Sequence, residues 1–177
     1  MSKEKKSLLL VNILGGIAVI GSYIWGLLTH PGSGNMLWGN IPAGLVPVYT
    51  VNMFLAATGY LCFTAFVIFF LDPSKTQINI RAGYKGFLVL YLLILVPSAL
   101  WMPLTYLMLD NPSSLLWFAI RLVLLLVGVG GLGMLSALLS LRPRTRLNLV
   151  AFIGCIFFCI QVVLLDAFIW PAFFALP

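Results

Sequence analysis

Long apolar runs separated by short polar breaks make up almost the whole chain. A helix needs about 20 apolar residues to cross the hydrocarbon core of a bilayer. Five runs reach this length, and they cover about residues 8–28, 46–71, 86–109, 115–141 and 147–174. These runs are continuous, whereas membrane β-barrel strands are alternating segments of about ten residues. The pattern predicts an all-α integral membrane protein, a bundle of five transmembrane helices forming a single domain over residues 1–177.

The polar breaks carry the usual signals for helix ends. His30 and Pro31 open a glycine-rich segment after the first run, and Asp72-Pro73-Ser74 closes the second. Asp110-Asn111-Pro112-Ser113-Ser114 is a tight turn whose serines can cap the fourth helix. Arg142-Pro143-Arg144 ends that helix. The chain is therefore expected to cross back and forth with mostly short connections.

The composition excludes the soluble classes of protein. Hydrophobic residues make up 62% of the chain and charged residues 8%, whereas about a quarter of the residues in a soluble domain are charged. The cysteines Cys62, Cys155 and Cys159 lie in apolar runs and form no metal motif. A soluble enzyme, a disordered chain and a disulfide-rich secreted domain are all excluded.

Basic residues gather beside three of the breaks. Nine of the ten lie before the first run, between the second and third, or between the fourth and fifth: Lys3, Lys5, Lys6, Lys75, Arg81, Lys85, Arg142, Arg144 and Arg146. Cytoplasmic loops are enriched in Lys and Arg. We therefore expect a cytoplasmic N-terminus and an outer C-terminus in a bacterial-type cytoplasmic (inner) membrane. The net charge of +6 then reflects contact with the lipid bilayer and not with nucleic acid.

Two charged residues lie inside the apolar runs. A charge at mid-depth costs at least about 2.5–3.5 kcal/mol on insertion scales. At 1.5 Å per residue, Arg121 in the fourth run and Asp166 in the fifth both come out about 10 Å below the outer surface. We expect them to form an ion pair. The pair is either a structural clasp between two helices or a charged wall of a ligand cavity, and both roles are compatible.

The tryptophans indicate a pocket that opens outward. All five of them lie in the outer half of the predicted bundle. An aromatic belt at the membrane surface explains Trp38 and Trp117, but Trp101 lies too deep for one. Pro97 and Pro103 flank Trp101 and would open space beside it by kinking the helix. The predicted pocket takes a hydrophobic ligand between helices and is lined by Tyr49, Asn52, Trp101, Arg121 and Asp166.

Motifs for chemistry or metal binding are missing from the sequence. Residues 128–133 match G-x-G-x-x-G, but they lie inside an apolar run and not between a strand and a helix, so they indicate close packing. Cys155 and Cys159 have no further ligands beside them. The sequence contains no catalytic constellation, which argues against an enzyme. Small residues such as Ala18, Ser22 and Gly26 predict close helix contacts, within the bundle or between protomers.

Several segments resemble the TspO/translocator protein family of tryptophan-rich sensory proteins. Leu14-Gly15-Gly16 is similar to the glycine pair of its first helix. Val46-Pro47-Val48-Tyr49 resembles its proline-led second helix, and Ala99-Leu100-Trp101-Met102-Pro103 its tryptophan-proline signature in the third. Residues 163–170 are similar to its fifth helix, with Asp166 where the family usually has asparagine.

This resemblance implies a five-helix bundle, a homodimer, and a hydrophobic or tetrapyrrole ligand in an outward pocket. The role implied is that of a receptor, sensor or transport protein, with Arg121 pairing with an acidic group of the ligand. The fifth helix has no tyrosine, so the cholesterol-recognition motif proposed for the family is absent. An alternative of a different class is an accessory or structural subunit of a larger membrane complex. In that case the ion pair of Arg121 and Asp166 only holds the two helices together.

Overall fold

The computed structural model describes residues 1–76, 78, 83–142 and 145–174. This part of the chain is helical and has no strand. Five helices are long and apolar enough to cross a membrane, which confirms the predicted all-α fold with five long apolar helices. They are α1 (Lys3–Thr29), α2 with η2 (Val46–Ala65, Phe66–Phe70), η3 with α3 (Gly83–Lys85, Gly86–Asp110), α4 (Ser114–Ser140), and α5 with η4 and α6 (Arg146–Cys159, Ile160–Ile169, Trp170–Phe173). A further short helix, η1 (Ser33–Trp38), follows α1.

Helices α1, α4 and α5 begin at polar caps that the sequence supplies. Helix α1 starts five residues before the expected apolar run, because the Ser2 side chain accepts a hydrogen bond from the Lys5 N–H at 3.3 Å. The expected serine cap of α4 is confirmed, since Ser113 Oγ accepts from the Leu115 N–H at 3.3 Å. Helix α3 runs unbroken through Pro97 and Pro103.

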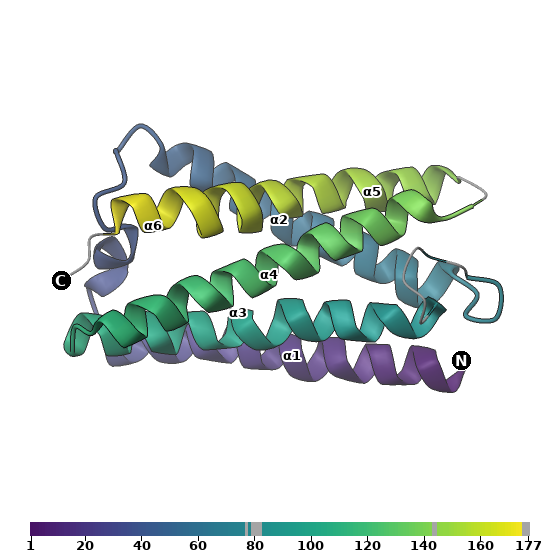
Figure 1. Cartoon of the computed structure of the whole chain (residues 1–177), viewed down its shortest axis with the longest axis horizontal. Helices are drawn as coiled ribbons and strands as arrows, with labels where there is room; N and C mark the ends of the chain where they lie inside the picture. The colour runs from purple at the N-terminus through teal and green to yellow at the C-terminus, as the bar shows by residue number, and fades with distance from the viewer. Residues whose placement is uncertain (77, 79–82, 143–144, 175–177) are drawn as a thin grey trace.

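The five long helices form a bundle in which α1 lies at the edge (Figure 1). Helix α3 packs between α1 and α4, and the α5–η4 helix packs against α4 and α2. The two termini lie at opposite ends of the bundle. The connection after η2 and the one after α4 both lie at the end that holds the N-terminus, so the described basic residues except Arg121 gather there. We call this the basic end; Arg81 and Arg144 lie outside the described residues.

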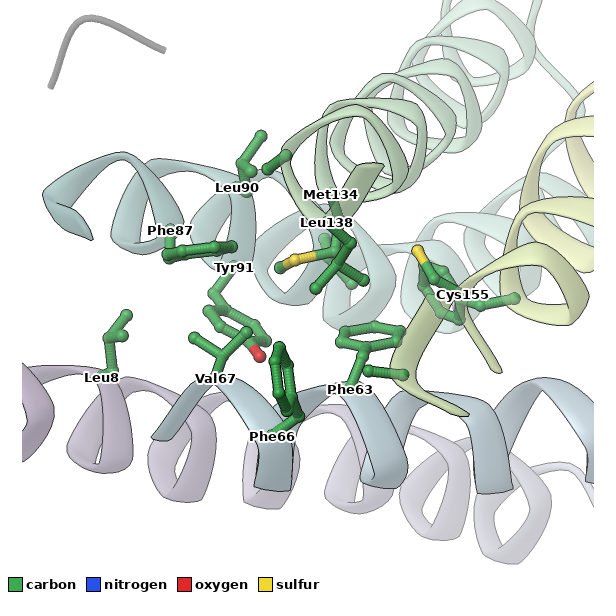
Figure 2. Packing of buried hydrophobic residues seen from close by; sticks show 14 of the residues in the cluster. Leu8, Phe63, Phe66, Val67, Phe87, Leu90, Tyr91, Met134, Leu138 and Cys155 are labelled. Atoms are coloured by element: carbon green, nitrogen blue, oxygen red, sulfur yellow. The ribbon is translucent and has the colours of Figure 1, made fainter. Parts of the chain in front are cut away.

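Two apolar clusters fill the interior, one toward each end of the bundle. Figure 2 shows the cluster near the basic end, where all five long helices contribute. Its labelled members are Leu8, Phe63, Phe66, Val67, Phe87, Leu90, Tyr91, Met134, Leu138 and Cys155. The other cluster joins Tyr49 of α2, Ile120 of α4 and Trp170 of α6 near the opposite end, which we call the outer end.

Helices α2 and α5 touch each other through their backbones. A Cβ atom added to Gly59 of α2 would lie 2.1 Å from the carbonyl oxygen of Gly154 on α5. Other glycines also pack inside the bundle: a Cβ on Gly26 would meet Tyr106 at 2.6 Å, and one on Gly133 would meet Leu90 at 2.5 Å. These glycines therefore allow close contacts between helices within one chain. The glycines of the G-x-G-x-x-G match lie within α4, as expected.

Gly59→Ala is expected to destabilise the protein, because the new methyl group would meet backbone atoms that cannot move aside. Overpacking of this kind costs about 1–3 kcal/mol. The measurement is the thermal unfolding midpoint of detergent-purified protein, followed with a dye that reacts with the buried thiols Cys155 and Cys159 as they become exposed.

Gly16→Ala is the matched control. Gly16 lies on α1, and a Cβ there would meet nothing within 4 Å. Its midpoint should stay unchanged or rise, because alanine favours a helix over glycine by roughly 0.5–1 kcal/mol. Equal midpoints for the two variants would show that the α2–α5 contact tolerates a side chain.

Candidate functional site

A chain of hydrogen-bonded polar side chains crosses the interior between the two apolar clusters. Asn52 Nδ2 of α2 donates to Gln161 Oε1 of η4 at 3.1 Å, and Gln161 Nε2 donates to Asp166 Oδ1 at 2.8 Å. Asn52 Nδ2 also lies 3.3 Å from the carbonyl oxygen of Phe157. Asn52 and Gln161 are both buried, with 7% of each residue exposed. Asn52, Gln161 and Asp166 therefore satisfy one another's hydrogen-bonding groups in the interior of the bundle.

The register of α2 and α5 brings Asn52 and Gln161 together. Asn52 lies seven residues before Gly59, and Gln161 lies seven residues after Gly154. The two helices run in opposite directions (Figure 1). Seven residues make about two helical turns, so on each of the two helices the amide lies about 10 Å from the glycine contact, toward the outer end. The two amides arrive at the same level and meet.

The π-helical form of η4 brings Gln161 and Asp166 onto one face. In an α-helix with about 3.6 residues per turn, side chains five positions apart point about 140° apart. A π-helix closes its hydrogen bonds between residues i and i+5, so such side chains lie nearly above one another. The Trp170 N–H donates to the Leu165 carbonyl in this pattern. The local helix type therefore allows the Gln161–Asp166 hydrogen bond.

Tyr49 hydrogen-bonds to the helix that carries Gln161 and Asp166, and Trp101 packs against the apolar cluster that contains Tyr49. The Tyr49 hydroxyl donates to the Leu165 carbonyl at 2.8 Å. The Trp101 ring lies 5.7 Å from the ring of Tyr23 and 5.9 Å from that of Trp170, between centroids. Its indole N–H is buried, and it alone among the buried side-chain N and O atoms of the described residues has no hydrogen-bond partner. Trp101 therefore offers a donor that the protein itself does not use.

The expected ion pair between Arg121 and Asp166 is not formed. The ion pairs of the described residues join His30 to Asp110 and Lys75 to Asp72, while Asp166 accepts its hydrogen bond from Gln161. Counting residues predicted a similar depth for both charges, but it could not predict the direction in which each side chain points around its helix axis. Arg121 is exposed beside the fully buried Ile120, on the side of α4 that carries Phe118 and Leu125.

Of the residues proposed for the pocket, Asn52 and Asp166 belong to one hydrogen-bonded chain through Gln161. Tyr49 hydrogen-bonds to the Leu165 carbonyl of the same helix, and Trp101 packs against the outer apolar cluster. Arg121 lies outside the chain. Sequence analysis missed Gln161, although a glutamine inside an apolar run, five positions before Asp166, was a visible signal. Trp117 is also not part of a surface belt, since only 4% of it is exposed and its ring lies 6.1 Å from that of Trp170.

The segment between α1 and α2 covers the outer end of the bundle. Trp170 Nε1 donates to the Leu37 carbonyl at 2.8 Å, and the Asn40 N–H donates to the Phe173 carbonyl at 2.9 Å. His30 stacks on Tyr106 with ring centroids 4.1 Å apart. These contacts tie the segment to α3 and α6.

The donor set of the described residues suits hydrogen bonding better than metal binding or catalysis. They include no group of three or more His, Cys, Asp or Glu side chains that could hold a metal ion. The polar chain consists of two amides and one carboxyl group. Comparisons with protein-family models, curated proteins and solved structures found no match to this chain.

Gln161→Leu is expected to lower the thermal unfolding midpoint, because it leaves the Asn52 amide and the Asp166 carboxyl group without their shared partner. The loss should be about 1–3 kcal/mol, the cost of unsatisfied buried polar groups. The double variant Asn52→Leu/Gln161→Leu should lose less than the sum of the two single changes, with a coupling of about 0.6–1.7 kcal/mol.

Thr50→Val is the control for a polar residue of α2 outside the polar chain, since the exposed Thr50 hydroxyl donates only to the Val46 carbonyl of its own helix. Its midpoint should stay close to wild type. Strictly additive losses at Asn52 and Gln161 would contradict the coupled chain.

Proposed function

We propose that this chain is an integral membrane protein that binds a hydrophobic, tetrapyrrole-like ligand between the outer halves of its helices. The five long apolar helices support the membrane placement. The basic end then faces the cytoplasm, because Lys and Arg favour that side, and the C-terminus lies outside. The membrane is of the bacterial cytoplasmic type.

The single observation that carries the ligand proposal is the unpartnered indole N–H of Trp101. Inside a bilayer every buried polar group needs a partner from the protein or from a bound molecule. An acceptor on a ligand, such as a carboxyl or carbonyl oxygen, would satisfy this donor. The rings of Tyr23 and Trp170 beside Trp101 would then contact the apolar ring system of the ligand.

The resemblance to the TspO/translocator protein family agrees with this proposal. The tryptophan-proline segment of that resemblance contains Trp101, and its fifth-helix segment contains Asp166. The ligand site then consists of Tyr49, Asn52, Trp101, Gln161 and Asp166, and the role is that of a sensor or transport protein acting as a homodimer. Arg121 is not needed for this site.

Arg121 instead favours a second candidate function, that of an accessory subunit in a larger membrane complex. Its guanidinium is exposed on an apolar face next to Phe118, whose residue surface is 64% exposed, and it has no ion-pair partner among the described residues. A charge at this depth is costly unless it reaches the headgroups or a partner protein. An acidic residue on another subunit would satisfy it.

Trp101→Phe is expected to weaken protoporphyrin IX binding about tenfold, because a hydrogen bond to a charged or strongly polar group contributes about 1.5–3 kcal/mol. Binding is measured in detergent by the shift of the porphyrin absorption band. This readout does not depend on the number of tryptophans, and quenching of tryptophan fluorescence provides a second measurement.

Trp25→Phe is the matched control, because Trp25 is 45% exposed on α1 and its ring contacts only that of His30 among the described rings. Its affinity should equal that of wild type. Absence of saturable binding by the wild type would refute the tetrapyrrole ligand. Unchanged affinity in a folded Trp101→Phe variant would refute the site.

Arg121→Leu separates the two candidate functions. If the chain is an accessory subunit, a stoichiometric partner that copurifies from native membranes is lost with this change, because its acidic residue no longer finds a cation. Porphyrin affinity should stay the same. Copurification of the same partner with wild type and variant would contradict a role for Arg121 in assembly.

A further inference from the structure

A cavity of about 300 Å³ opens between α1 and α3 at the basic end, far from the polar chain. Its lining consists of Lys3, Glu4, Ser7 and Leu8 from α1, and Tyr84, Lys85 and Leu88 from η3 and α3. This volume lies at the lower end of the range of about 300–1,000 Å³ found for small-molecule sites. The lining combines charged, hydroxyl and aliphatic groups.

The charged groups of this cavity interact with one another, because Glu4 lies within electrostatic range of Lys85 and Lys3 and also hydrogen-bonds with Ser2. Within the described part of the chain, Lys3, Glu4 and Lys85 take part in no ion pair. The two ammonium groups of Lys3 and Lys85 favour an anion such as a phosphate. Glu4 favours a cation or a strong hydrogen-bond donor at the same place.

The inner end of the cavity is apolar, and it is closed where helices α1 and α3 meet. Leu8 is 2% exposed, and Tyr84 is held by its hydroxyl, which donates to the Val67 carbonyl at 3.0 Å. Helices α1 and α3 meet beneath at Gly15 and Leu95, where a Cβ on the glycine would lie 2.7 Å from the leucine side chain. Leu88 of the lining and Leu92, one turn further along α3 and 43% exposed, provide an apolar surface for an aliphatic chain.

We propose that this cavity binds the headgroup of a phospholipid that carries a primary ammonium, phosphatidylethanolamine, in the leaflet at the basic end. Lys3 and Lys85 bind the phosphate, Glu4 accepts hydrogen bonds from the ammonium, and Leu8 and Leu88 contact the start of the acyl chains. Choline has no N–H to offer Glu4, and the glycerol headgroup has no positive charge. The proposal rests on the membrane placement proposed above, but not on the ligand at the outer end.

The test is native mass spectrometry of detergent-purified, delipidated protein mixed with equal amounts of phosphatidylethanolamine, phosphatidylglycerol and phosphatidylcholine with identical acyl chains. We expect one phosphatidylethanolamine to be retained with about tenfold preference, since hydrogen bonds to charged groups contribute this much. Lys3→Ala/Lys85→Ala should weaken retention about thirtyfold, because each lysine near a lipid phosphate contributes roughly fivefold. Glu4→Gln should keep phospholipid bound but abolish the preference for ethanolamine.

Lys6→Ala/Lys75→Ala is the matched control, because it removes the same charge from the same end but neither residue lines the cavity. Its retention should equal that of wild type. Equal loss in both double variants, or equal retention of all three lipids by wild type, would overturn the proposal. Displacement by soluble glycerophosphoethanolamine would also overturn it, by showing a site for a free phosphate ester.

Membrane placement is checked on the same chain by alkaline carbonate extraction. A chain that leaves the membrane fraction refutes the membrane placement and the lipid site together. A chain that stays in the membrane but shows no lipid preference refutes the lipid site alone. The unfolding midpoint of each variant confirms that lost binding is not lost folding.

Discussion

Helices α2 and α5 touch backbone to backbone at Gly59 and Gly154, and the position of the polar groups in the outer half follows from this contact. Two glycines fix both the distance between the helices and their register, because a side chain on either would separate them. The equal spacing of seven residues then sets Asn52 opposite Gln161. A contact between the backbones of two glycines, with no side chain involved, thus determines where the buried hydrogen bonds form.

The interior is organised by the need to satisfy polar groups where water is scarce. Asn52, Gln161 and Asp166 satisfy one another in a single layer between two apolar clusters. Trp101 packs against the outer apolar cluster with an unused donor, and Arg121 lies outside the layer on an apolar face. These two residues carry the two functional proposals, because the described chain supplies no hydrogen-bond partner for the Trp101 indole N–H and no ion-pair partner for Arg121.

The sequence predicted the five long helices well and the site only in part. The apolar runs, the cap at Ser113 and the break at His30 fixed the helix ends to within a few residues, apart from the start of α1 at Lys3. Such features are formed by residues that lie close together in the sequence, so they can be recognised from one sequence alone. The ion pair of Arg121 and Asp166 failed because depth follows from counting residues, whereas direction depends on helix type and on neighbouring helices. The pairing of α2 with α5 rests on contacts more than ninety residues apart along the chain.

The π-helical segment η4 also bears on how this site arises in evolution. A substitution changes the chemistry at one fixed direction, but a gain or loss of one residue in a helix turns every later side chain by about 100°. The hydrogen bond between Gln161 and Asp166 depends on the wider turn, so it is sensitive to the number of residues in this segment as well as to their identity. Among related chains, we expect insertions and deletions here to separate those that keep the buried polar layer from those that have lost it.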